Sequence, residues 1–180
     1  GSSLATEQKM ESEGDDGARR HRQVDGYLWN GMDDFPLDVT RVRVDRSVTK
    51  IPSHAFSDRW RLLEVELPQG LTEIDMSAFG KCDGLTNLEL PEGLRIIGAC
   101  AFGSCKSLVN VNIPSTVEEI RSNAFQYCPS LEAVVFPVGL RTIESGAFVG
   151  CSSLQKIEIP RGLKVINYMA FSGCNSLVDL

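Results

Sequence analysis

The sequence contains little of the chemistry on which most enzymes depend. Its 180 residues include only two histidines, His21 and His54. The six cysteines form no C-x-x-C pair, and no glycine-rich loop is present that would hold phosphate groups. Zinc sites need ligands that converge on one point, and nucleophilic catalysis needs a base within hydrogen-bond reach of the nucleophile. We therefore predict no catalytic residues, no metal ligands and no cofactor, and hence no enzyme.

Two further absences limit the partners. No apolar run is long enough to span a membrane, which predicts no membrane insertion. The formal net charge is −6, and residues 1–38 contribute −5 of it, with four Lys or Arg against nine Asp or Glu. The remainder is almost neutral, which predicts no binding to nucleic acid, because that requires a basic surface. Unpaired cysteines favour an intracellular location, but a signal removed before the opening Gly-Ser-Ser would allow a cell-surface location.

What the sequence does contain is a repeat. The dipeptide Ala-Phe occurs six times at a constant spacing of 23 residues, with phenylalanines at Phe56, Phe79, Phe102, Phe125, Phe148 and Phe171. Such a period predicts a solenoid, in which one small unit stacks on itself. Each unit opens on two alternating apolar residues, which predict a short strand with one buried face. In five units a proline follows and ends the strand. A turn, an extended stretch and a helical or 3₁₀ turn carrying Ala-Phe-x-x-Cys then complete the unit.

When the repeats are aligned, the equivalent residues of all repeats form columns, and several of these columns are predicted to point inward. They include the leucine or valine column and the isoleucine column, at Val48, Leu71, Leu94, Val117, Leu140 and Leu163, and at Ile51, Ile74, Ile97, Ile120, Ile143 and Ile166. The cysteine column, at Cys82, Cys105, Cys128, Cys151 and Cys174, is interpreted as a row of buried small apolar residues. Cys100 lies outside this column and is predicted to be a partly exposed free thiol.

The sequence divides into three parts. Residues 1–24 are polar and aperiodic, which predicts a disordered acidic leader. Residues 25–38 are predicted to cap the first unit, with Tyr27, Leu28 and Trp29 entering a hairpin at Asn30-Gly31. Residues 39–180 hold six repeats, and the last unit is unchanged, so we expect the array to continue beyond Leu180. An open final unit also predicts end-to-end self-association.

The columns together read L-x-x-L-x-I-P-x-x-L-x-x-I-x-x-x-A-F-x-x-C-x-x-L over residues 39–180. This pattern resembles the signature of the BspA-type leucine-rich repeat. The resemblance implies a right-handed leucine-rich-repeat solenoid of the α/β class, dominated by β-structure, with parallel strands on its concave side. It also implies a surface or interaction protein, since some bacterial members look like adhesins.

The predicted partner-binding residues are those of the strand that point outward between buried positions. They change from repeat to repeat, while the buried columns hardly vary. They are Arg41, Arg43, Glu64, Glu66, Asn87, Glu89, Asn110, Asn112, Ala133, Val135, Lys156 and Glu158. We predict that this concave face binds a protein or peptide with a basic segment beside an apolar anchor. The alternative is an architectural or adhesin-like spacer, in which no particular exposed residue matters.

Overall fold

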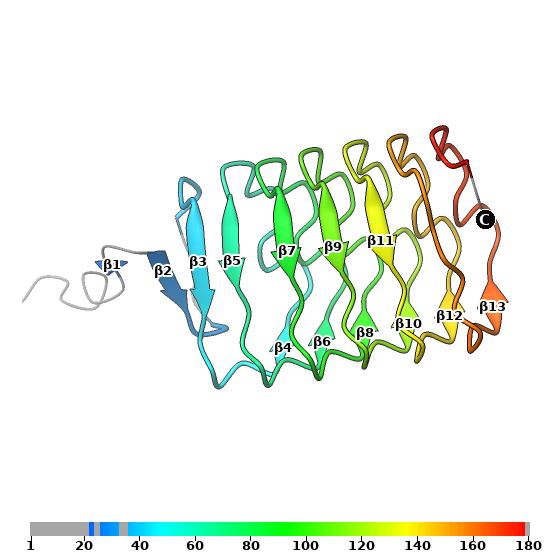
Figure 1. Ribbon diagram of the computed structural model, residues 1–180. Helices are drawn as coiled ribbons and strands as arrows, with labels where there is room; N and C mark the ends of the chain where they lie inside the picture. Colours follow the sequence, from blue (N-terminus) through cyan, green and yellow to red (C-terminus); the bar gives the residue numbers. More distant parts are fainter. Residues whose placement is uncertain (1–21, 24–25, 33–35, 179–180) are drawn as a thin grey trace, which may run out of the picture.

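The computed structural model describes residues 22–23, 26–32 and 36–178 as one parallel-strand β-solenoid (Figure 1). Equivalent residues of neighbouring turns pair at a separation of 23 positions, as in Asn87 opposite Asn110. The predicted period and strand direction are therefore confirmed. No helix capable of crossing a bilayer occurs in the part of the chain that the structure describes.

Each of the first five repeats contributes a first strand to one side of the solenoid. These strands are β3 (Arg41–Val44), β5 (Glu64–Glu66), β7 (Asn87–Glu89), β9 (Asn110–Asn112) and β11 (Ala133–Val135). In the sixth repeat the strand is reduced to a single bridge between Ala133 and Lys156. The row is also interrupted within the array. Strands β3 and β5 belong to one sheet and β7, β9 and β11 to another, so β5 and β7 are neighbours without ladder hydrogen bonds.

A second strand in each repeat forms a continuous parallel sheet of six strands. Its strands are β4 (Lys50–Ile51), β6 (Glu73–Ile74), β8 (Ile96–Ile97), β10 (Glu119–Ile120), β12 (Thr142–Ile143) and β13 (Val165–Ile166). The extended stretch predicted for this part of the unit is therefore a paired strand. The isoleucines that end β4, β6, β8, β10 and β12 point inward, as expected when side chains alternate between the two faces of a strand.

The segment around Ala-Phe consists of hydrogen-bonded turns, and the described residues contain no α- or 3₁₀-helix. This differs from the predicted helical turn, and the backbone explains why. The residue before Ala-Phe and the residue two after it have positive φ, as in Cys100 (54°) and Ser104 (61°). Because a right-handed helix requires consecutive negative φ angles, only the short stretch between such residues is available, and no helix can form.

The second positive-φ column provides a test of this backbone conformation. It contains Asp58, Lys81, Ser104 and Tyr127, and glycine at Gly150 and Gly173. We expect Ser104→Gly to raise the free energy of unfolding by about 0.5–1 kcal/mol, because glycine adopts positive φ without steric cost. The reverse change, Gly150→Ser, should destabilise, since its Cβ would lie 2.7 Å from Cδ1 of Tyr127. Urea denaturation of both variants measures this, and destabilisation by Ser104→Gly would contradict it.

The core is a stack of phenylalanine rings along the solenoid axis. Phe56, Phe79, Phe102, Phe125 and Phe148 have no exposed surface. Successive ring centroids from Phe56 to Phe171 lie 4.8–5.4 Å apart, with interplanar angles of 4–14°. The inward columns are buried as predicted, except that Leu67 is half-buried and that the last repeat is more exposed. There Ile159 and Ile166 are 41% and 47% exposed, because no further repeat covers them in this structure.

The cysteine column connects each turn to the one before it. Cys82, Cys105, Cys128 and Cys151 are buried, and each Sγ lies 3.1 Å from the carbonyl oxygen of a phenylalanine 26 residues earlier. Cys174, half-buried in the last repeat, makes the same contact at 3.2 Å. The predicted small apolar residue is thus also a thiol donor to a backbone carbonyl of the preceding turn.

The first turn is covered by residues N-terminal to it. Strand β2 (Gly26–Trp29) pairs antiparallel with β1 (Arg22–Gln23) and parallel with β3. Trp29 is buried and meets Phe56 edge-on, with ring centroids 4.8 Å apart. The hairpin predicted at Asn30-Gly31 is wrong, because β2 and β3 run parallel and need a longer connection. The predicted disordered leader lies almost entirely outside the described residues.

Candidate functional site

All twelve predicted partner-binding residues are exposed on one side of the solenoid. Ten of them belong to β3, β5, β7, β9 and β11, and Lys156 and Glu158 continue the row in the sixth repeat. We call this set the first-strand face. Its residues stand in register because the turns stack without slippage, and the buried valine, leucine or isoleucine between each pair fixes the outward direction.

The charges at both ends of the first-strand face are paired with one another. Arg41 Nε lies 3.2 Å from Glu64 Oε2, and Arg43 binds Glu66 through Nε at 2.5 Å and Nη2 at 3.2 Å. Lys156 Nζ lies 2.9 Å from Glu158 Oε1. The hydrogen bond from Arg43 lowers the pKa of Glu66, and that from Lys156 lowers the pKa of Glu158. The arginines of β3 and the glutamates of β5 therefore form cross-strand ion pairs, and Lys156 pairs with Glu158 within the sixth repeat.

The middle of the first-strand face differs in chemistry from its ends. Asn87, Asn110 and Asn112 present amides on neighbouring strands, and each amide can both donate and accept hydrogen bonds. Ala133 and Val135 lie beside Asn110 and Asn112 on β11, and Val135 is 67% exposed. Among the described residues, no cation lies within ion-pairing distance of Glu89. This part of the face keeps polar and apolar groups available to a partner.

A groove of about 960 Å³ lies where the first strands are not hydrogen-bonded to each other. One side is formed by residues 63–67 and Gln69, and the other by residues 86–87 and 89–92, with Arg41 and Asn112 also contributing. Because both sides are runs along a strand, the groove extends parallel to β5 and β7. Leu63, at its edge, is 53% exposed.

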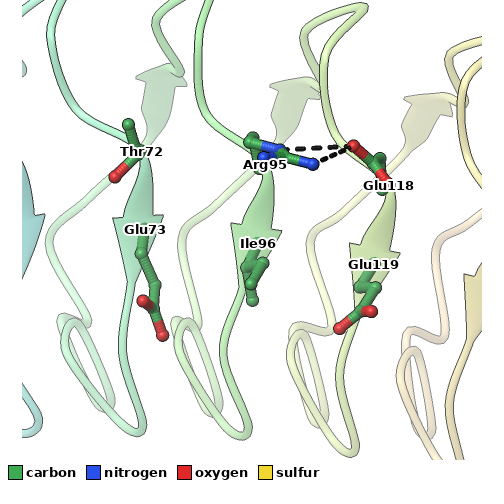
Figure 2. Close-up of a pocket in the computed structure, with 6 residues that line it drawn as sticks. All are labelled: Thr72, Glu73, Arg95, Ile96, Glu118 and Glu119. Carbon is green, nitrogen blue, oxygen red and sulfur yellow. Dashed lines mark hydrogen bonds and ion pairs between the residues drawn. The ribbon is translucent and has the colours of Figure 1, made fainter.

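A second, smaller groove of about 430 Å³ lies on the sheet formed by the second strands. Figure 2 shows its six lining residues on β6, β8 and β10 and just before them, with Ile96 between the carboxylates of Glu73 and Glu119. The sequence interpretation did not identify this surface. Its signal was available in the two variable residues before each inward isoleucine, such as Glu118 and Glu119 before Ile120.

The charges around this second groove compensate each other. Arg95 Nη2 lies 2.7 Å from Glu118 Oε1, and this contact lowers the pKa of Glu118 (Figure 2). The other carboxylate oxygen of Glu118, Oε2, lies 3.7 Å from Arg141 Nε. Lys50 Nζ lies 3.3 Å from Glu73 and 3.1 Å from Asp75. Glu119 lies 3.5 Å from Arg121. Such exposed pairs contribute little to stability, but they leave few charges here for a partner.

The cysteines have the properties of structural thiols. All six are free. Burial raises the pKa of Cys82 to about 12, and it raises the pKa of Cys105, Cys128 and Cys151 well above the ordinary 9.0. The pKa of the half-buried Cys100 is also raised by burial. Since the thiolate is the reactive form, these side chains lack the environment of a nucleophile or redox centre at neutral pH.

Comparison with solved structures finds bacterial leucine-rich-repeat proteins. The chain is 39% identical to the leucine-rich-repeat protein TpLRR of T. pallidum, with a TM-score of 0.74, over 78% of this chain and 65% of that one. A leucine-rich-repeat protein from Bacteroides ovatus is 25% identical over 69% of this chain and 38% of that one, with a TM-score of 0.54. The chain thus spans less than two thirds of the length of these proteins. No curated protein matches it.

The repeats themselves match a family model. The model describes a BspA type leucine rich repeat region with six copies, and it matches residues 38–178. That range begins at the turn before β3 and includes every first and second strand, the phenylalanine stack and the cysteine column. The chain belongs to the BspA-type leucine-rich-repeat family.

Proposed function

We propose that this chain is a protein-interaction module whose first-strand face binds a protein or peptide partner without catalysis. Leucine-rich repeats of this family generally serve as protein-interaction or adhesion scaffolds. The observation that carries the proposal is the middle of the first-strand face. There, exposed amides and Val135 lie on a fixed core, and they have few contacts of their own to lose on binding.

The physical reason is the low cost of binding to such a surface. The backbone of each turn is held by ladder hydrogen bonds and by the buried phenylalanine stack, so little conformational entropy remains to be lost. Asparagine amides fix the orientation of a bound segment, and an exposed aliphatic residue beside them supplies apolar area. The ion pairs at both ends of the face limit the charge that a partner has to match.

A peptide-display selection tests this function. The immobilised chain is compared with a variant carrying Asn110→Ala, Asn112→Ala and Val135→Ser. A matched control variant carries Thr72→Ala, Thr142→Ala and Val165→Ser on the opposite sheet. Circular dichroism checks that all three proteins are folded. We expect clones that bind the parent and the control variant, with binding to the first-strand variant reduced about tenfold or more, which corresponds to about 1.4 kcal/mol.

Two outcomes would count against this function. If no clones are enriched on the parent, the face does not recognise peptides. If the clones bind the first-strand variant as well as the parent, recognition lies elsewhere. Either outcome favours the architectural or adhesin-like spacer, in which the length of the array matters and individual exposed residues do not.

A further inference from the structure

We propose that the groove between β5 and β7 binds an extended peptide segment with lysine or arginine at alternate positions, lying parallel to the strands. This inference rests on the proposed function and specifies the partner and its place. It is carried by the shape of the groove, its apolar surface, its uncompensated charge and the missing ladder between the two strands.

The shape of the groove matches one extended segment. The extended parts of its two sides run over residues 63–68 and 86–91, which correspond to about 17 Å at the rise of about 3.3 Å per residue in a strand. A peptide in the same conformation would fill this length with about six residues. Its side chains would point toward the groove at every second position, the same spacing as Glu64 and Glu66 on β5.

The charge of the groove selects a basic partner. Four carboxylates line it, on Glu64, Glu66, Glu89 and Glu92, against the single cation of Arg41. Arg41 and Arg43 compensate Glu64 and Glu66. Glu92 accepts a hydrogen bond from Ser115 Oγ at 2.9 Å, and no described cation lies within ion-pairing distance of Glu89 or Glu92. The side of the groove toward β7 therefore keeps two negative charges for a ligand.

The surface between these charges suits the stems of long basic side chains. Val65 and Leu90 are 8% exposed at the base of the groove, Leu67 is half-buried, and Leu63 is exposed at its edge. Lysine and arginine pack their methylene groups on apolar surface while their charged ends stay in water. Acidic or purely polar segments would meet like charges or leave this apolar area uncovered.

The missing ladder places the groove at this position in the array. The described neighbours β3 and β5, β7 and β9, and β9 and β11 are all hydrogen-bonded, whereas β5 and β7 are not. Gly84 lies between them in sequence, and its backbone is so close to the first repeat that a Cβ would lie 2.9 Å from Trp60 O. The turn that leads into β7 is therefore packed closely on the first repeat.

A titration with defined peptides tests this inference. An octapeptide that alternates lysine with threonine is added to isotope-labelled protein, and its binding is followed through the backbone amide signals. A glutamate–threonine peptide and a peptide with the same lysines in one block serve as ligand controls. We expect the alternating lysine peptide to shift the signals of residues 63–67 and 86–92 saturably, and to bind more tightly than the block peptide.

Charge variants test whether Glu89 and Glu92 are the groups that bind the lysine peptide. We expect Glu89→Gln with Glu92→Gln to weaken binding of the alternating peptide roughly fivefold to tenfold, since each exposed charge contact contributes little. Glu73→Gln with Glu119→Gln, on the opposite sheet, should leave it unchanged. The proposal is overturned if no signals shift, if the shifted signals lie elsewhere, or if both variant pairs weaken binding equally.

The outcomes also separate this inference from the function on which it rests. If the lysine peptide fails but selected clones still depend on Asn112 and Val135, the first-strand face is a binding surface and the groove assignment is wrong. If both experiments fail, both proposals are wrong.

Discussion

Phe102→Ala is expected to lower the free energy of unfolding by about 3–5 kcal/mol. Phe102 is fully buried in the middle of the stack, with its ring centroid 5.3 Å from that of Phe79 and 5.2 Å from that of Phe125. Its loss removes apolar contacts on both sides and leaves a cavity that the rigid ladders cannot close. Such a change is a large part of the stability of a typical domain, which is about 5–15 kcal/mol.

The measurement is equilibrium denaturation in urea, with Val138→Ala as the matched control. Val138 is 83% exposed, so its truncation should change stability by no more than about 0.5 kcal/mol. If Phe102→Ala behaved like Val138→Ala, the phenylalanine stack would not be the main source of stability. A second variant, Phe102→Leu, should lose less than the alanine variant because it fills part of the cavity.

Alkaline pH is expected to destabilise the protein through its buried thiols. In the unfolded chain a cysteine loses its proton near pH 9.0, whereas burial raises the pKa of Cys82 to about 12 in the folded protein and raises those of Cys105, Cys128 and Cys151 as well. Above pH 9.0 unfolding therefore releases protons, and stability falls as the pH rises. The contribution of these thiols is fully present below pH 9.0 and is lost progressively toward pH 12.

The expected size of this effect follows from the number of thiols. Each shifted group contributes about 1.4 kcal/mol per pH unit, so the four together contribute about 5.6 kcal/mol per unit well above pH 9. We expect denaturation midpoints to drop sharply between about pH 9 and pH 10. The variant Cys105→Ala with Cys128→Ala should roughly halve the slope, although it starts from lower stability. An equal slope in parent and variant would show that lysines and tyrosines, not thiols, cause the loss.

Much of the fold could be predicted from the sequence because the repeat constrains it strongly. The 23-residue spacing of Phe56 to Phe171 specifies which residues stack, and alternation around Val65 and Val111 specifies the direction of each side chain. The pairing of Arg43 with Glu66 also follows from this spacing, since they are 23 positions apart. The twelve residues of the first-strand face were identified in this way, although their role in binding remains a proposal.

Other features depend on backbone geometry that the pattern does not encode. Residues with positive φ, such as Lys81 and Tyr127, are not the glycines that usually mark this conformation, so the loss of the helical turn could not be predicted. The interruption between β5 and β7 was equally hidden, because Glu64–Glu66 and Asn87–Glu89 have the same alternating pattern as the strands that pair. The groove between β5 and β7 can therefore be located only from the positions of the strands in the structure.

The constant register has a consequence for how such a gene can change. Each turn bonds to its neighbours through partners at fixed separations in the sequence, such as 23 positions for Asn87 with Asn110 and 26 for Cys128 with Phe102. An insertion or deletion of one whole unit therefore restores every partner on both sides, whereas any other length shifts all later columns out of alignment. Unequal recombination between units that share the same core columns can lengthen or shorten the array while preserving its fold, and each such event also brings a different set of first-strand side chains together.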